Sequence, residues 1–204
     1  MFEAFARSNV IGLIPPDNTR FRRAMARAFA PKRVVQLVPD MQKSCDALID
    51  RMVEKRECDF IHDFALPLPV AIICQMLNIS LEDQHLFANW SATLLAGLEL
   101  SADPGEAEKA ETATVNLYDY LRKIAEKLRG NPGDDLISTL IEAADEEKIS
   151  AEEVIWGSIT PLVAGHETTT HLLGNGMLAL IRNPGQLRCA NSPGRGEARG
   201  TRCL

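Results

Sequence analysis

The feature that most constrains the fold of this chain is a long, mostly apolar stretch that begins after Ser150 and reaches Ile181. Ser150 and Glu153 match the S-x-x-E pattern of a capping box, in which two residues satisfy each other's backbone N–H groups at the start of a helix. A helix of this length spans about 45 Å at a rise of 1.5 Å per residue. It is the longest helix that the sequence predicts.

Shorter helices are predicted along most of the remaining chain, because apolar residues recur there every three to four positions. One of them carries Phe21, Met25 and Phe29 on a single stripe among arginines. The predicted helices cover approximately residues 17–29, 40–53, 64–79, 80–95, 117–128 and 136–141. Residues 58–61 (CDFI) are expected to form a short strand, and residues 99–108 a loop. The predicted fold class is therefore mainly α, with little strand.

The composition is that of a folded intracellular protein. Hydrophobic residues make up 46% and charged residues 25% of the chain, which is typical of a globular domain. No uninterrupted apolar run approaches the length of about 18 residues that a membrane span needs. The chain also does not start with the basic and then apolar segments of a secretion signal. We therefore expect a cytoplasmic protein without a membrane partner.

Charge and cysteine content argue against nucleic-acid binding, a disulfide framework and a structural zinc site. The net charge of −6 argues against general nucleic-acid binding, although residues 1–33 hold seven Lys/Arg and only two acids. The five cysteines, at positions 45, 58, 74, 189 and 203, are scattered and form no CxxC pair. A disulfide framework and a structural zinc site are both poorly supported by this pattern.

An unusual group of small and polar residues interrupts the long helix. Gly165 costs about 1 kcal/mol relative to Ala in a helix interior, and the Thr168 hydroxyl is expected to bond back to the carbonyl of Ala164. The pair Ala164-Gly165 clears space for a flat ligand to approach the backbone. Glu167 and Thr168 place an acid beside an alcohol, which suits a proton relay. The alternative interpretation is a polar patch on a surface helix.

Two segments carry a family resemblance. Residues 164–169 (AGHETT) resemble the oxygen-binding helix of the cytochrome P450 family, the heme-thiolate monooxygenases, whose pattern is [A/G]-G-x-[D/E]-T-[T/S]. Residues 15–23 (PPDNTRFRR) are similar to the family's P-P-[D/E]-H-T-R-x-R-R segment. The resemblance extends from about Val10 to Asn183 and corresponds to the middle portion of the family's chain, from the propionate-binding helix to the oxygen-binding helix.

The resemblance implies a cofactor and a set of site residues. It implies a heme (iron protoporphyrin), with Arg22 holding a propionate and Asn18 standing where the family has a propionate-binding histidine. A guanidinium is well suited to fork onto a carboxylate. Ala164 and Gly165 are implied to shape the oxygen groove, and Glu167 and Thr168 to relay protons.

The activity implied is insertion of one oxygen atom of dioxygen into an apolar small molecule. Electrons are implied to come from NAD(P)H through a ferredoxin or flavoprotein partner. No cysteine, however, stands in the family's F-x-x-G-x-x-x-C-x-G setting, so the sequence supplies no axial metal ligand, and the E-x-x-R pair is also absent. A catalytically inactive remnant of such an enzyme is therefore the alternative, and the chain as written is expected to be inactive alone.

The chain divides in composition near its end. Residues 1–182 are expected to form a partial P450-like helical domain. Residues 183–204 contain four Gly, four Arg and two Pro with one acid, and are expected to be irregular. A shift of the reading frame near Leu187 in a GC-rich gene would also produce this compositional bias. In that hypothesis, Met1 is an internal start.

Two other functions fit the same residues less well. An all-α DNA-binding regulator that uses Arg20–Arg33 is a remote alternative, because no helix-turn-helix turn adjoins that helix. A zinc protease needs histidines at i and i+4, whereas His166 and His171 are five residues apart, about 140° around a helix. His62 and His85 have no partner at ligand spacing and are interpreted as ordinary surface or cap residues.

Overall fold

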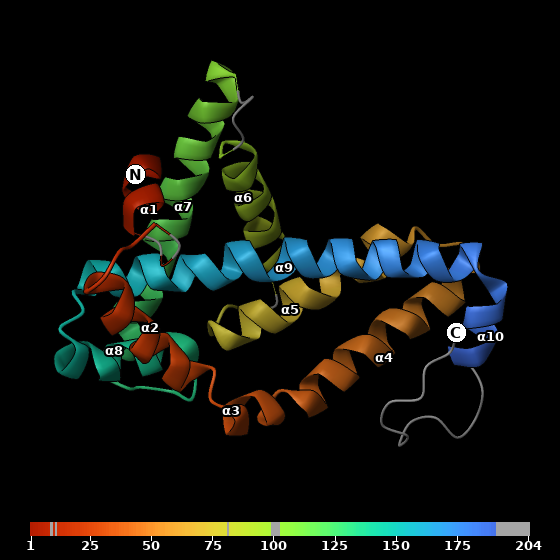
Figure 1. Cartoon of the computed structure of the whole chain (residues 1–204), viewed down its shortest axis with the longest axis horizontal. Coiled ribbons are helices and arrows are strands. Elements are labelled where there is room, and N and C mark those ends of the chain that lie inside the picture. The colour runs from red at the N-terminus through yellow and green to blue at the C-terminus, as the bar shows by residue number, and fades with distance from the viewer. Residues whose placement is uncertain (9, 11, 81, 99–102, 191–204) are drawn as a thin grey trace.

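The structure, a computed structural model, describes residues 1–8, 10, 12–80, 82–98 and 103–190 (Figure 1). The first helices along the chain are α1 (Phe2–Ser8), α2 (Asp17–Ala28), α3 (Pro31–Gln36), α4 (Val38–Lys55), the π-helix η1 (Ile61–Ala65) and α5 (Pro67–Met76). They are followed by α6 (Gln84–Ala96), α7 (Pro104–Leu128), α8 (Leu136–Glu147), α9 (Ala151–Arg182) and α10 (Pro184–Ala190). The prediction of a mainly α fold is confirmed.

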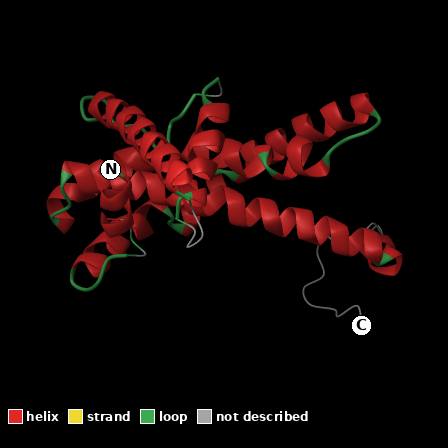
Figure 2. Ribbon diagram, turned by 90° about the horizontal axis from the view of Figure 1, so that it is seen from above, coloured by secondary structure: helices red, strands yellow, loops and turns green. Residues whose placement is uncertain are grey.

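The prediction of a short strand at residues 58–61 is wrong. Among the described residues, Figure 2 shows helices and loops and no strand. The reason is local capping by Asp59. Its Oδ1 accepts the backbone N–H groups of Ile61 (2.9 Å) and His62 (3.1 Å). A carboxylate that accepts the first N–H groups of a turn favours a helix start over an extended strand, and the chain enters η1 at this point.

Two helix starts also differ from those that the sequence predicts. Asp103 and Glu106 form a full capping box, so α7 begins at Pro104, inside the segment expected to be a loop. Conversely, α6 begins only at Gln84. The Ser80 hydroxyl accepts the backbone N–H of Asp83 (3.3 Å) and donates to the Asp83 carboxylate (2.9 Å), so both bonds lie in the segment before the helix.

The long helix α9 organises the fold. It is 32 residues long and starts at the predicted capping box of Ser150 and Glu153. It packs against η1, α1, α5, α6, α7, α8 and α10, and Figure 1 shows it crossing the whole molecule. Its first half is the centre of the core, where Trp156, Ile159 and Leu162 are almost fully buried. Burial of a large apolar side chain contributes about 1.5–3 kcal/mol.

Helix α2 is fixed to the beginning of α9 by an aromatic ring and an ion pair. The Phe21 ring is fully buried and lies against Gly157, where an added Cβ would be 2.1 Å from the ring's Cζ atom. The Arg20 guanidinium pairs with the carboxylate of Glu153 and donates to the carbonyl of Lys148 (2.6 Å). These contacts set the place of α2, and with it Arg22, relative to α9.

The segment directly after α9 forms a short helix. Residues predicted to be irregular from Asn183 onward include the short helix α10, while residues 191–204 lie outside the described part of the chain. The irregular tail stays a prediction there. Among the described residues, no helix combines the length and hydropathy of a membrane span.

Candidate active site

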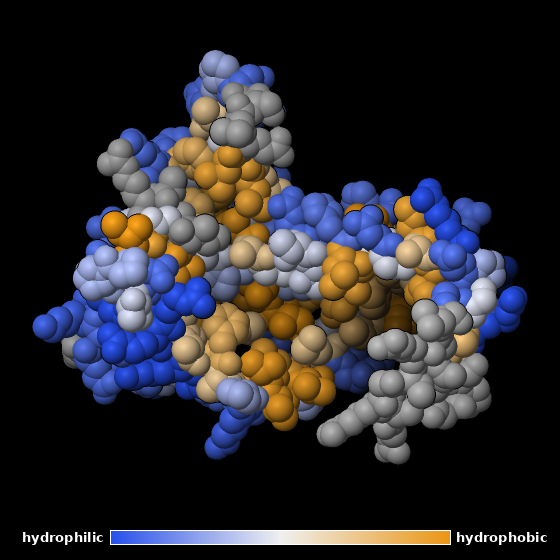
Figure 3. All heavy atoms as spheres, in the orientation of Figure 1, coloured by the Kyte–Doolittle hydropathy of each residue, from blue (hydrophilic) through white to orange (hydrophobic). Residues whose placement is uncertain are grey.

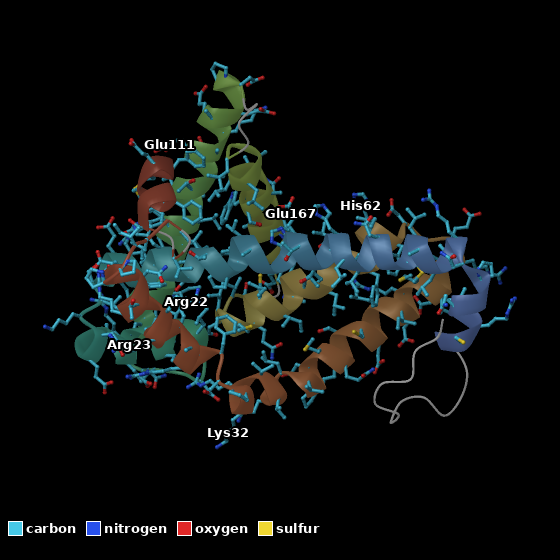
Figure 4. The ribbon with its side chains drawn as sticks, in the orientation of Figure 1. Arg22, Arg23, Lys32, His62, Glu111 and Glu167 are labelled. Carbon is cyan, nitrogen blue, oxygen red and sulfur yellow. The ribbon has the colours of Figure 1, made fainter. Side chains whose placement is uncertain are left out.

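The predicted oxygen-groove residues occupy one turn at the middle of α9. The Thr168 hydroxyl donates to the carbonyl of Ala164 (2.8 Å), as the sequence predicts. Ala164 and Thr168 are exposed, and so is Leu172 one turn later. Glu167, labelled in Figure 4, is half-buried and has no hydrogen bond or ion pair to any described residue. This turn therefore presents a small side chain, a hydroxyl and an uncommitted carboxylate on an open face.

Gly165 faces a different neighbour. A Cβ at this position would lie 2.8 Å from Cδ1 of Ile73 on α5, so the space that the glycine leaves is used by that side chain. The carbonyl of Gly165 accepts from the Thr169 hydroxyl (2.9 Å). The open approach to the backbone is thus beside Ala164 rather than at Gly165.

The opposite face of the same turn is buried and polar. His166 is 2% exposed; its Nδ1 lies 2.9 Å from the carbonyl of Leu162 and its Nε2 3.4 Å from the Ser91 hydroxyl on α6. The Thr170 hydroxyl donates to the carbonyl of Ala65 (3.1 Å). His166 therefore joins α6 and α9. No group of three metal-ligating side chains occurs among the residues that the structure describes.

The two predicted propionate residues lie one turn apart on α2. Asn18 is half-buried, and its Nδ2 donates to the carbonyl of Val10 (2.8 Å), which uses one of its two amide hydrogens. Arg22 is exposed and has no hydrogen bond or ion pair to the described residues. Figure 4 shows it projecting from α2. Its guanidinium is available to an external anion.

Four arginines between residues 20 and 33 form ion pairs within the fold, which sequence reasoning missed. Besides Arg20, three basic residues form ion pairs with acids further along the chain: Arg23 with Glu147 (3.2 Å), Arg27 with Glu146 (2.7 Å) and Arg33 with Asp134 (3.0 Å). Part of the positive charge of residues 1–33 is thus neutralised by acids from distant segments. Arg22 differs from these four arginines in having no such partner among the described residues.

The two groups of predicted site residues remain separate. Gly157, which holds α2 through Phe21, precedes Thr168 by eleven positions, or about 16 Å along the helix axis. No hydrogen bond or ion pair joins Asn18 or Arg22 to the turn of Thr168 within the described ranges. A ligand that uses both groups must extend along α9.

An apolar groove continues from this turn toward the end of α9. It has a volume of about 610 Å³ and lies between α4, η1 and α9. Its lining consists of Ile49, Met52, Phe60, Phe64, Leu172, Leu173, Gly176, Met177 and Leu180. Figure 3 shows hydrophobic atoms in the hollow between α9 and α4. Such a surface suits apolar partners or ligands.

The described cysteines do not offer a thiolate to this site. Cys74 is fully buried, and burial raises the pKa of its thiol to about 12. Cys45 is half-buried, and burial likewise raises the pKa of its thiol. Cys58 and Cys189 lie outside the turn of Thr168, on the segment before η1 and on α10.

Comparison with known proteins gives a consistent family. No family model matches the sequence. A cytochrome P450, CYP107DY1 of Priestia megaterium, is 38% identical over 184 residues, which are 88% of this chain and 43% of the relative. The cytochrome P450 monooxygenase PikC of Streptomyces venezuelae is 34% identical over 189 residues, 91% of this chain and 44% of the relative.

Solved structures agree with the sequence relatives. P450BioI, in complex with an acyl carrier protein ligated to hexadec-9Z-enoic acid, superposes with a TM-score of 0.86 at 26% identity, over 92% of this chain and 48% of its own. The myxobacterial cytochrome P450 CYP267B1, in complex with myristic acid, gives a TM-score of 0.82 at 37% identity, over 91% and 46%. The chain spans less than half the length of these proteins. Sequence and fold agree over about nine-tenths of its own length, and the chain therefore belongs to the cytochrome P450 family.

Proposed function

We propose that this chain forms the part of a cytochrome P450 monooxygenase that holds one face of the heme and delivers protons to dioxygen. The reaction is insertion of one oxygen atom into an apolar small molecule in the cytoplasm, with electrons from NAD(P)H through a ferredoxin or flavoprotein. The observation that carries the proposal is the open turn of α9, where the Thr168 hydroxyl is held on the Ala164 carbonyl beside an uncommitted Glu167.

The residues present fit one side of a heme. Arg22 is an exposed guanidinium without an internal partner, as a propionate ligand requires, and Asn18 retains one amide hydrogen one turn away. Ala164 leaves the helix surface low enough for a flat ring. When bound, heme supplies the iron at which dioxygen is reduced and activated.

The chain's own contribution to the reaction is proton transfer. Thr168 Oγ1 carries a proton and is held in place by its bond to the Ala164 carbonyl. To donate this proton to the reacting oxygen, the Thr168 hydroxyl rotates away from the Ala164 carbonyl, and the Glu167 carboxyl passes a proton from solvent back to Thr168 Oγ1. A positioned proton transfer of this kind is worth about 10²–10⁴-fold in rate.

A second candidate is the catalytically inactive remnant, favoured by the absence of a cysteine in the family's Gly-bracketed setting. Adding hemin to the chain and following the Soret band separates the two candidates. Saturable binding followed by a thiolate-type band with carbon monoxide after reduction supports a monooxygenase. Saturable binding without that band supports the remnant. If hemin does not bind at all, both candidates are contradicted as heme-binding proteins.

The matched variants Arg22→Gln and Arg23→Gln test the assigned residue. Arg22→Gln is expected to weaken hemin binding about tenfold, since a charge-assisted hydrogen bond contributes about 1.5–3 kcal/mol. Arg23→Gln is expected to leave it unchanged, because Arg23 already pairs with Glu147. Equal affinities for the two variants would contradict the role of Arg22.

The reading-frame proposal has its own test. Sequencing the coding DNA past the codon of Leu204 is expected to reveal, in another frame, the E-x-x-R pair followed by the Gly-bracketed cysteine. Continuous sequence in the present frame, with a genuine stop after Leu204, would contradict a shift near Leu187.

A further inference from the structure

Besides the apolar groove, a second pocket with a polar rim lies where α4, η1, α5 and α6 meet. It is separate from the turn of Thr168. Its volume is about 330 Å³, and its rim carries three basic side chains, Arg51 from α4, His62 from η1 and His85 from α6. No carboxylate lines it. Arg51 has no hydrogen bond or ion pair to the described residues, and Figure 4 shows His62 projecting outward from η1.

The floor of this pocket is apolar. It consists of Leu66, Pro67 and Val70 at the start of α5 and of Ala88 on α6. Val70 is 4% exposed and belongs to the hydrophobic core, while Leu66 and Ala88 pack against that core. The pocket thus combines an arginine on its rim with a hydrophobic base, which is the pattern of a site for a molecule with a charged end and an apolar body.

An unpaired polar group adds independent evidence for a ligand. The Nε2 atom of Gln84, which lines the pocket, is buried and has no hydrogen-bond partner among the described residues. A buried amide without an acceptor costs free energy, and such groups call for a specific explanation. The Gln84 amide is therefore a donor without an acceptor at the wall of the pocket.

Arg51 is the formal positive charge on the rim, and the two histidines are held by oxygen atoms beside it. The Nδ1 atom of His62 contacts Oδ2 of Asp59 (3.0 Å), and Nδ1 of His85 donates to the backbone carbonyl of Glu82 (2.8 Å). With Nδ1 used in this way, a neutral imidazole presents only the acceptor Nε2 to a ligand, so the donors to an anion are Arg51 and Gln84. Lys55 and Asp63 nearby neutralise each other (2.6 Å).

We propose that this pocket binds a small organic carboxylate with an aromatic or branched apolar body. The carboxylate pairs with the Arg51 guanidinium and accepts a hydrogen bond from Gln84, while the apolar body lies on Leu66 and Val70. The site uses none of the residues assigned to heme or dioxygen and does not depend on that assignment.

Isothermal titration of the full chain with phenylacetate tests the proposal, with 2-phenylethanol as the neutral analogue and inorganic phosphate as an anion without an apolar body. Saturable binding of phenylacetate is expected, at least about tenfold tighter than that of either comparison compound, because only phenylacetate satisfies both rim and floor. Equal affinity for 2-phenylethanol or for phosphate would overturn the proposal.

Three variants locate the site. Arg51→Gln is expected to weaken phenylacetate binding about tenfold, and Ala88→Leu to abolish it by filling the floor. Arg129→Gln, an exposed arginine at the end of α7, is expected to have no effect. Circular dichroism verifies that each variant is folded. Unchanged binding in a folded Arg51→Gln protein would contradict the assignment.

Discussion

The ring of Phe21 on α2 occupies the space that a side chain at Gly157 on α9 would need, with only 2.1 Å between its Cζ atom and a Cβ built at that position. Because Arg22 follows Phe21 directly, this contact also fixes where the proposed propionate ligand stands relative to the long helix. Glu153, one turn before Gly157, adds the ion pair with Arg20. One turn of α2 thus holds a packing residue and a structural arginine beside the unpartnered Arg22.

Gly157→Ala is expected to lower the free energy of unfolding by about 1–3 kcal/mol, because a methyl group overpacks the seat of a fully buried ring. Urea denaturation followed by circular dichroism measures the change. The matched control is Gly176→Ala in the same helix, where nothing lies within 4 Å of an added Cβ. There, alanine is expected to stabilise by up to about 1 kcal/mol. Equal effects of the two substitutions would contradict the packing argument.

Neighbouring arginines on α2 are expected to differ in their effect on stability. Arg20→Gln should cost about 1–2 kcal/mol, because it leaves the partly buried Glu153 carboxylate without its partner. Arg22→Gln should stay within about 0.5 kcal/mol of the original chain, as is usual for an exposed side chain without contacts. Urea midpoints of the two variants test the difference. A large loss for Arg22→Gln would mean that Arg22 is structural.

The ion pair of Arg20 also predicts how stability depends on pH. Burial raises the pKa of the Glu153 carboxyl, but hydrogen bonds from Arg20 and Ser150 outweigh this effect and hold the pKa below its usual value. A depressed carboxyl pKa stabilises the fold above the unfolded value of about 4.3 and ceases to do so as the pH falls through the lower, folded value. The original chain should therefore lose stability in acid more steeply than Glu153→Gln.

Urea unfolding at a series of pH values from neutral to acid measures this slope. Glu57→Gln is the control, because Glu57 is exposed and has no hydrogen bond or ion pair to the described residues. Its slope should match that of the original chain. A slope for Glu153→Gln as steep as that of the original chain would show that the ion pair does not produce the pH dependence.

The cysteines are expected to differ sharply in reactivity. Cys74 is fully buried, and burial raises the pKa of its thiol to about 12, so the reactive thiolate is scarcely populated at neutral pH. Cys58 is exposed. Brief treatment of the folded chain with iodoacetamide, followed by peptide mass spectrometry, should find Cys58 modified and Cys74 intact. Denaturant should make Cys74 react, and rapid modification without denaturant would contradict its burial.

Local sequence signals determined the helices and the family. The capping box of Ser150 and Glu153 marks the start of α9 because it satisfies backbone groups within four residues of each other. The bond from Thr168 to Ala164 is equally local. The missed start of α7 was also readable, since Asp103 and Glu106 form the same kind of box. The error at residues 58–61 came from giving apolar content more weight than the capping potential of Asp59.

Tertiary structure decided which of several similar side chains are available. The sequence puts Phe21 and Phe29 on one stripe, yet Phe21 is fully buried and Phe29 is 39% exposed, because only Phe21 meets the glycine of α9. The sequence likewise does not show that Arg20 is paired in the fold and Arg22 is not. Besides the local Asp17, Arg20 contacts Lys148 and Glu153, which lie more than a hundred residues away, and contacts at that separation form only when the helices pack.

The second pocket illustrates the same limit. His62 and His85 are unremarkable in the sequence, since they lie 23 positions apart without a ligand pattern between them. The packing of η1 and α6 against the start of α5 places both on one rim with Arg51. Sequence therefore determined the helices, their caps and the family motifs, which depend on neighbours along the chain. Only the packed structure determined which charges are neutralised and which remain open to a ligand, because that depends on residues brought together from distant segments.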